Sequence, residues 1–154
     1  MHARQNCPSW DETYMEIAHT IKRRSKDPST QVGAVIVGSD NRILSTGYNG
    51  TPHGFDDASF PWGKGSDNPL ENKNLFVIHA ELNAILNFKG LGKDLDGATV
   101  YVTLFPCNEC AKTLVQSGVN RVVYSEKRDS TSYKAASILF GQAGVETKFF
   151  NPNS

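Results

Sequence analysis

Residues 79–110, HAELNAILNFKGLGKDLDGATVYVTLFPCNEC, contain the pattern that decides the fold. Apolar residues in the first part recur at helical spacing, and Gly90 and Gly92 end this helix. Thr99–Thr103 is a β-branched and aromatic run, which is typical of a strand. A second helix is expected to begin at Pro106, because proline suits the entry to a helix. The stretch therefore predicts a helix, a strand and a helix in succession, as in α/β folds.

The rest of the chain extends this unit in both directions. We expect a first helix between the Ser9–Glu12 capping box and Asp27-Pro28, with Tyr14, Ile17, Ala18 and Ile21 on its buried face. The elements that follow are expected, in chain order, to be strands Val32–Val37 and Ile43–Tyr48, the helix from His79, the strand Thr99–Thr103, a helix Pro106–Ser117, a strand Arg121–Tyr124, a helix Ser132–Ala143 and a strand Val145–Phe150. Ser39-Asp40-Asn41 predicts a hairpin turn between the first two strands, and right-handed crossovers should join the later ones. The predicted class is α/β, a three-layer α/β/α fold with a five-stranded mixed sheet.

Length and composition indicate one domain spanning residues 1–154, with its motifs between residues 7 and 150. Lys plus Arg equals Asp plus Glu at 16 each, so net charge gives no general attraction to nucleic acid or membranes. No apolar run is long enough for a membrane span, and the first residues lack a signal-peptide core, so we expect a cytoplasmic protein. The Gly-, Pro-, Asp- and Asn-rich stretch 49–74 predicts a functional loop, and Phe55, Phe60 and Trp62 indicate that it is packed.

Two short motifs carry the chemistry: His79-Ala80-Glu81 and Pro106-Cys107-Asn108-Glu109-Cys110. Each is a modest signal alone, but H-x-E followed by P-C-x-x-C is the signature of zinc deaminases. Cysteines three apart on a first helical turn lie on one face, and a helix N-terminus favours their thiolate form. With His79 they give three zinc ligands and leave a fourth position open, as in catalytic zinc sites. His53 is the only loop histidine that could compete.

Glu81 is expected to move protons rather than bind the metal. Zinc lowers the pKa of a bound water to about 7, and a carboxylate two residues past His79 can take its proton. The same carboxylate can then protonate the ring nitrogen and the leaving ammonia. Three simpler readings stand beside this one: a thioredoxin-type redox pair, a closed structural zinc knuckle, and a solvated carboxylate at a helix start. The isolated Cys7 is expected to be an ordinary free thiol.

At these residues the sequence resembles the deoxycytidylate deaminases of the cytidine deaminase superfamily. The similar segments are Ser25–Pro28 with Gln31–Ala34, Gly47–Gly50 with Pro52 and Gly54, HAELNAIL at 79–86 and FPCNECAK at 105–112. The resemblance implies a cytidine-deaminase-like fold and one catalytic Zn²⁺ per chain, held by His79, Cys107 and Cys110. It also implies that Glu81 is the proton shuttle in hydrolysis of dCMP to dUMP and ammonia, which feeds dTMP synthesis.

The resemblance extends to substrate and effector residues. Asn49 matches an asparagine that contacts the substrate sugar, although Asn also suits a left-handed turn, and Ala80 is expected beside the substrate. The aromatic that follows the fourth strand in the family is missing after Tyr124, so Tyr133 or Arg128 is expected to act there. Many members are homohexamers activated by dCTP with Mg²⁺ and inhibited by dTTP. An effector pocket is accordingly expected at Lys26, Gly47, Tyr48, Asn49 and Gly50.

Other functions remain open from the sequence. The altered segment after Tyr124 leaves room for an enzyme that also accepts dCTP. A tRNA or free-nucleoside deaminase is less favoured, because a tRNA-binding member should show a basic face and the net charge of zero gives little support for one. A catalytically silent zinc scaffold that binds nucleotides would not need Glu81. We therefore expect small deoxynucleotides as ligands, with no membrane or nucleic-acid partner.

Overall fold

Five strands form one mixed sheet in the order β2-β1-β3-β4-β5, in a computed structural model that describes residues 1–152. The elements are α1 (Trp10–Lys22), β1 (Gly33–Val37), β2 (Ile43–Tyr48), α2 (Ala80–Asn87), β3 (Thr99–Val102), α3 (Asn108–Gln116), β4 (Arg121–Tyr124), α4 (Thr131–Ala143) and β5 (Glu146–Phe149), with short 3₁₀ helices at Pro69–Glu71, Lys73–Leu75 and Gly92–Leu95. Strand β1 is antiparallel to β2 and β3, whereas β3, β4 and β5 are parallel. The predicted five-stranded mixed sheet is confirmed.

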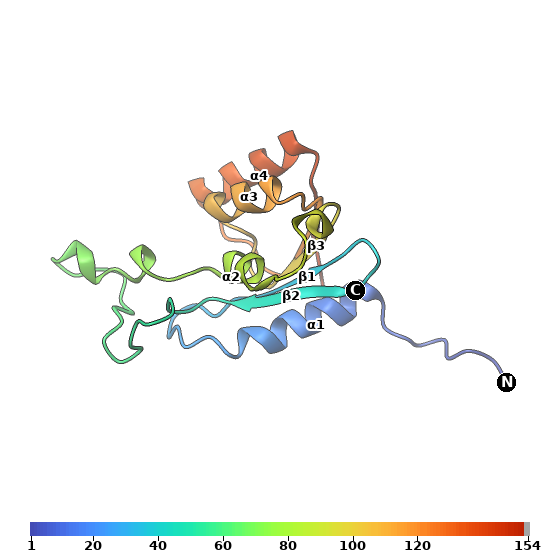
Figure 1. Ribbon diagram of the computed structural model, residues 1–154, viewed down its shortest axis with the longest axis horizontal. Helices are drawn as coiled ribbons and strands as arrows, with labels where there is room; N and C mark the ends of the chain where they lie inside the picture. Colours follow the sequence, from blue (N-terminus) through green and yellow to red (C-terminus); the bar gives the residue numbers. More distant parts are fainter. Residues whose placement is uncertain (153–154) are drawn as a thin grey trace.

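Helices cover both faces of this sheet and make three layers, with α1 on one face and α2, α3 and α4 on the other (Figure 1). Every residue of β1 is buried, because alternate side chains point into different layers. Val35 and Val37 pack with Tyr14, Met15 and Ala18 of α1. Ala34 and Ile36 belong to the second cluster, which includes Ala80 and Ala84 of α2.

Several element boundaries differ from the sequence prediction. Helix α1 begins at the Ser9 cap as expected, but it ends at Lys22 rather than beside Asp27-Pro28. A proline disfavours helix only at the residue before it, here Asp27, so it does not account for a helix end five residues before Asp27. Ile17 and Ile21 are only half-buried, and Met15, which was not expected in the core, is 1% exposed.

Helix α3 begins at Asn108, two residues later than predicted, and β5 is exposed at all four positions. Cys107 is the N-cap, with extended backbone angles (φ −69°, ψ 170°), and only Cys110 lies within the first turn. The expectation that both cysteines belong to the first turn was therefore wrong. The short distance between them arises instead because a cap side chain faces the amide three residues later.

The long loop after β2 is packed, as its aromatic residues predicted. The rings of Phe55 and Phe60 lie 4.9 Å apart, and those of Phe60 and Trp62 lie 4.5 Å apart. The loop returns toward α2 by a backbone bridge, in which the amide of Gly50 donates to Ile78 and that of Ile78 donates to Gly50. Among residues 1–152, no helix combines the length and apolar character that a membrane crossing requires.

Candidate metal centre and active site

Three side chains from two helix starts form a candidate metal centre. His79 is the N-cap of α2, Cys107 is the N-cap of α3, and Cys110 follows one turn later. The Nδ1 atom of His79 lies 3.5 Å from both sulfurs, and the three ligand atoms lie within 4.8 Å of one another. A tetrahedral zinc with ordinary Zn–S and Zn–N bonds separates sulfur from nitrogen by about 3.6 Å. The donor set and its spacing therefore fit zinc.

The cluster contains three ligands, as the sequence predicted. Within the part of the chain that the structure describes, no fourth His, Cys, Asp or Glu joins the group, and His53 lines a different cavity. This is the ligand number of a catalytic zinc site, whereas a structural zinc knuckle closes with four protein ligands. Cys7 is an exposed free thiol, as expected.

The electrostatics of the cluster favour one thiolate even without a metal. A hydrogen bond from the Cys110 thiol lowers the pKa of the Cys107 thiol, despite the opposing effect of burial. The same hydrogen bond and burial raise the pKa of Cys110, and the contact with Cys107 raises that of His79. Thiolate is the form that binds metals, so the lowered pKa of Cys107 favours its metal-binding form.

Glu81 lies inside the fold beside this cluster. Its residue is 5% exposed, and burial raises the pKa of its carboxyl group to about 7. A solvated carboxylate at a helix start would show neither property, so that simpler reading of Glu81 is wrong.

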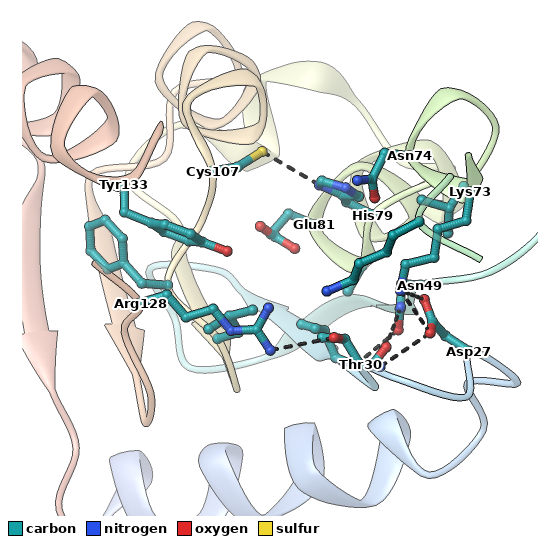
Figure 2. A pocket seen from close by; sticks show the side chains of 16 residues that line it. Asp27, Thr30, Asn49, Lys73, Asn74, His79, Glu81, Cys107, Arg128 and Tyr133 are labelled. Atoms are coloured by element: carbon teal, nitrogen blue, oxygen red, sulfur yellow. Dashed lines mark hydrogen bonds and ion pairs between the residues drawn. The ribbon is translucent and has the colours of Figure 1, made fainter. Parts of the chain in front are cut away.

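A cavity of about 220 Å³ opens in front of these residues. His79, Ala80, Glu81 and Cys107 line one side, together with Phe105. Figure 2 shows Tyr133 of α4 pointing toward Glu81 across the cavity, with Arg128 beside it. The structure thus brings the predicted residues Asn49, Ala80, Tyr133 and Arg128 to one cavity with Glu81 and two of the three metal ligands.

Asn49 is held by hydrogen bonds rather than by a turn. Its Oδ1 accepts from the amide of Val32 at 2.9 Å, and its Nδ2 donates to the carbonyl of Thr30 at 2.8 Å. Asn41 is the one non-glycine residue with positive φ in the described chain, so the left-handed reading of Asn49 is wrong. The side chain instead fixes the cavity wall between Thr30 and Val32.

The structure adds a buried ion pair to this wall that sequence reasoning missed. Lys73 and Asp27 are 3% and 2% exposed, and the Lys73 ammonium lies 2.7 Å from Oδ2 of Asp27. Two cationic residues, Lys64 and Arg128, also line the cavity. Nothing in the local sequence around Lys64 or Lys73 marks either residue, because both lie in the long loop and reach the cavity only through its folding.

A second cavity of about 210 Å³ lies against the end of β2. Its lining residues are Arg24, Lys26, Tyr48, Gly50, Thr51, His53, Asp57, Trp62, Ile78, Asn83 and Asn87. Three of the five predicted effector residues, Lys26, Tyr48 and Gly50, are therefore together. Gly47 instead faces α2, where an added Cβ would lie 2.4 Å from the carbonyl of Ala80, and Asn49 lines the first cavity.

A three-layer α/β fold that places a His-Cys-Cys cluster beside a buried glutamate defines the class of zinc-binding nucleobase deaminases. Residues 8–126 match the family model described as the cytidine and deoxycytidylate deaminase zinc-binding region. The chain is 46% identical to the probable deoxycytidylate deaminase of Drosophila melanogaster, covering 96% of this chain and 75% of the relative. It is also 46% identical to human deoxycytidylate deaminase, over 93% of this chain and 80% of that protein.

Solved structures agree with these sequence relatives. The dCMP deaminase of cyanophage S-TIM5, in complex with dCMP and dUMP, superposes with a TM-score of 0.74 at 29% identity, covering 97% of this chain and 100% of the other. The apo form of the same protein gives a TM-score of 0.71. This chain belongs to the cytidine and deoxycytidylate deaminase family.

Proposed function

We propose that this protein catalyses the zinc-dependent hydrolytic deamination of dCMP to dUMP and ammonia. One observation carries the proposal: the cavity that contains His79, Cys107 and Glu81 also contains the cationic side chains of Arg128 and Lys64. Deamination needs the first group of residues, and a monophosphate needs the second. The human and fruit-fly relatives are named for deoxycytidylate, and the cyanophage relative was solved with dCMP and dUMP.

Glu81 performs the proton transfers in this proposal. Zinc bound to His79, Cys107 and Cys110 would supply a water nucleophile that is activated near neutral pH. Glu81 takes a proton from that water and delivers it to N3 of cytosine, while the water oxygen adds to C4. Glu81 then takes the second proton from the new C4 hydroxyl and passes it to the amino group; the C4–N4 bond breaks, the C4 carbonyl of uracil forms, and ammonia leaves.

The remaining cavity residues hold the nucleotide. Tyr133 presents its half-buried ring and hydroxyl to the base, near Glu81 (Figure 2), while Asn49 faces the sugar and the backbone of Ala80 lies beside the base. Arg128 and Lys64 bind the phosphate. The guanidinium of Arg128 is 3.4 Å from the hydroxyl of Thr30 and is 45% exposed, which leaves N–H donors for an anion.

The second cavity is the proposed effector site for dCTP with Mg²⁺ as activator and for dTTP as inhibitor. Arg24, Lys26 and His53 supply groups for phosphates, and the rings of Tyr48 and Trp62 supply apolar surface. Lys26 forms an ion pair with Asp57. We expect this pair to open when a triphosphate with its magnesium occupies the cavity.

The protein is proposed to assemble as a homohexamer. The support is the resemblance to the family together with apolar side chains that the single chain leaves more than half exposed, among them Leu70, Leu75, Leu86, Leu91 and Ile138. Light scattering coupled to size-exclusion chromatography would give about six times the 16.9 kDa chain mass. A monomer at micromolar concentration would contradict this part of the proposal.

The decisive experiment measures ammonia release by the zinc-replete protein from dCMP, dCTP, deoxycytidine and cytidine. Each substrate is tested alone, with dCTP and Mg²⁺, and with dTTP. Fast dUMP formation that dCTP raises and dTTP lowers would support both the reaction and the effector site. Equal turnover of dCTP would make the enzyme bifunctional, and no release from any of the four would refute the substrate assignment.

A further inference from the structure

The long loop contributes its most deeply buried charge, Lys73, to the wall of the substrate cavity. Its ammonium contacts Oδ1 of Asp27 at 2.9 Å, Oδ2 of Asp27 at 2.7 Å and the hydroxyl of Ser29 at 2.6 Å. A lysine ammonium has three N–H donors, and these three contacts use them all. Lys73 is therefore not available to bind the phosphate of a nucleotide, although it lines the cavity.

The backbone of Lys73 connects three parts of the loop. Its amide donates to the carbonyl of Gly63 at 2.8 Å, and its carbonyl accepts from the amides of Phe76 and Val77 at 2.9 and 2.8 Å. Val77 lines the cavity, and His79 follows two residues later. The position of Lys73 thus sets the path of the chain that leads into the metal ligand.

Asp27 organises the opposite segment in the same way. Its Oδ1 accepts from the amides of Ser29 and Thr30 at 2.9 and 3.1 Å. Thr30 lines the cavity, and its carbonyl accepts from Nδ2 of Asn49. The ion pair therefore joins two cavity walls that are 46 residues apart in the chain, as the dashed contacts in Figure 2 show.

We propose that Asp27 and Lys73 are a positioning pair for deamination, which fixes the wall that carries Val77 and His79 against the wall that carries Thr30 and Asn49. The pair touches neither base nor phosphate. Loss of the pair displaces His79 together with the wall that carries Thr30 and Asn49. Every ligand of the cavity, with or without a phosphate, therefore binds more weakly by the same factor. The inference rests on the proposed function only for the identity of the nucleotide.

The test compares two variants that each remove one cation from this cavity. Lys73→Met breaks the buried ion pair with Asp27. The matched control, Lys64→Met, removes a cavity cation that forms no ion pair within residues 1–152. Calorimetry gives the dissociation constants of dUMP and deoxyuridine for each protein. For Lys73→Met we expect both constants to rise by about 10- to 100-fold, with their ratio unchanged, because loss of a residue that orients metal-site groups costs about that much in affinity or activity. For Lys64→Met we expect only the dUMP constant to rise.

A second variant separates positioning from simple stability. Lys73→Met leaves Asp27 buried without its cation, which destabilises the fold, so the double variant Asp27→Asn/Lys73→Met removes that charge as well. We expect the double variant to melt near the wild-type temperature but to keep weakened binding of both ligands. Cobalt substitution adds a readout that is independent of nucleotides: the absorption bands of bound Co²⁺ should shift in Lys73→Met and in the double variant, but not in Lys64→Met.

Three outcomes would overturn the proposal. A selective loss of dUMP affinity in Lys73→Met would make Lys73 a phosphate ligand. Recovery of both stability and binding in the double variant would make the pair merely structural. Unchanged nucleotide binding and unchanged cobalt bands in Lys73→Met would show that the Asp27–Lys73 pair does not position the site. If the wild type binds dUMP but releases no ammonia from dCMP, the proposed function fails while the binding comparison still tests the pair.

Discussion

At the scale of single residues, Glu81 is the side chain on which the proposed chemistry depends most. We expect Glu81→Gln to lower kcat for dCMP by about 10³-fold or more, because proton transfer by a positioned carboxylate contributes about 10²- to 10⁴-fold. The glutamine has nearly the same shape and is not among the three metal ligands. Mass spectrometry of the metal content should therefore still give one zinc per chain. Retained turnover, or loss of the zinc, would contradict the role assigned to Glu81.

Asp11 shows how one residue joins α1 to the sheet. Its carboxylate accepts from Tyr101 at 2.7 Å, from both terminal nitrogens of Arg121 at 3.0 and 2.9 Å, and from Lys148 at 2.7 Å. Hydrogen bonds from Arg121 hold the pKa of Asp11 far below its ordinary value of 3.8. Because the pKa is lowered in the folded state, the carboxylate stabilises the protein above pH 3.8, and this contribution is lost as the pH falls below that value.

We therefore expect Asp11→Asn to lower the free energy of unfolding by about 2 kcal/mol at pH 7, as is typical for hydrogen bonds to a charged group. The difference from the wild type should shrink in urea titrations as the pH is lowered from 4 toward 2. The control is Asp40→Asn, which alters an exposed pair with Arg42 and should leave stability unchanged. A difference between Asp11→Asn and wild type that stays constant with pH would argue against the linkage.

At the scale of elements, two glycines allow helices to pack closely on opposite faces of the β1–β2 hairpin. A Cβ added at Gly33 would lie 2.1 Å from the carbonyl of Ala18 in α1. One added at Gly47 would lie 2.4 Å from both the carbonyl of Ala80 and the amide of Ala84 in α2. These contacts are with backbone atoms, so the helix itself would have to move.

Gly47→Ala should accordingly push α2 away from β2 and displace His79 and Glu81 at its start. We expect the free energy of unfolding to fall by at least about 2 kcal/mol, within the range for overpacked cores. We also expect zinc to bind less tightly. Urea denaturation and a competitive zinc chelator measure the two effects. Gly50→Ala is the matched control, because its Cβ would meet only Tyr48, at 3.8 Å. Equal stability of the two variants would disprove the close-packing argument.

At the scale of the whole molecule, the features that were predictable from the sequence are those that local patterns determine. β-Branched runs predicted the strands, and the caps and spacing of the two motifs predicted the three candidate metal ligands and Glu81, because both depend on neighbours along the chain. Lys73 was missed because its partner lies 46 residues away in an irregular loop. The full exposure of β5 was missed because a strand pattern in the sequence does not show whether other elements will cover the faces of that strand.

The metal centre also connects parts of the molecule that few other contacts join. Its candidate ligands come from the starts of α2 and α3, so a bound zinc would hold the two helices together and stabilise the folded chain. Zinc at about 1,000 times its dissociation constant adds about 4 kcal/mol, which corresponds to about 10 °C in melting temperature for a chain of this size. We expect chelation to lower the melting temperature by that amount in calorimetry and zinc to restore it.

Cys110→Ser should melt like the chelated protein and respond little to zinc. The control Cys7→Ser, which alters an exposed thiol outside the cluster, should behave like wild type. Identical melting with and without zinc would show that the fold does not depend on the metal centre.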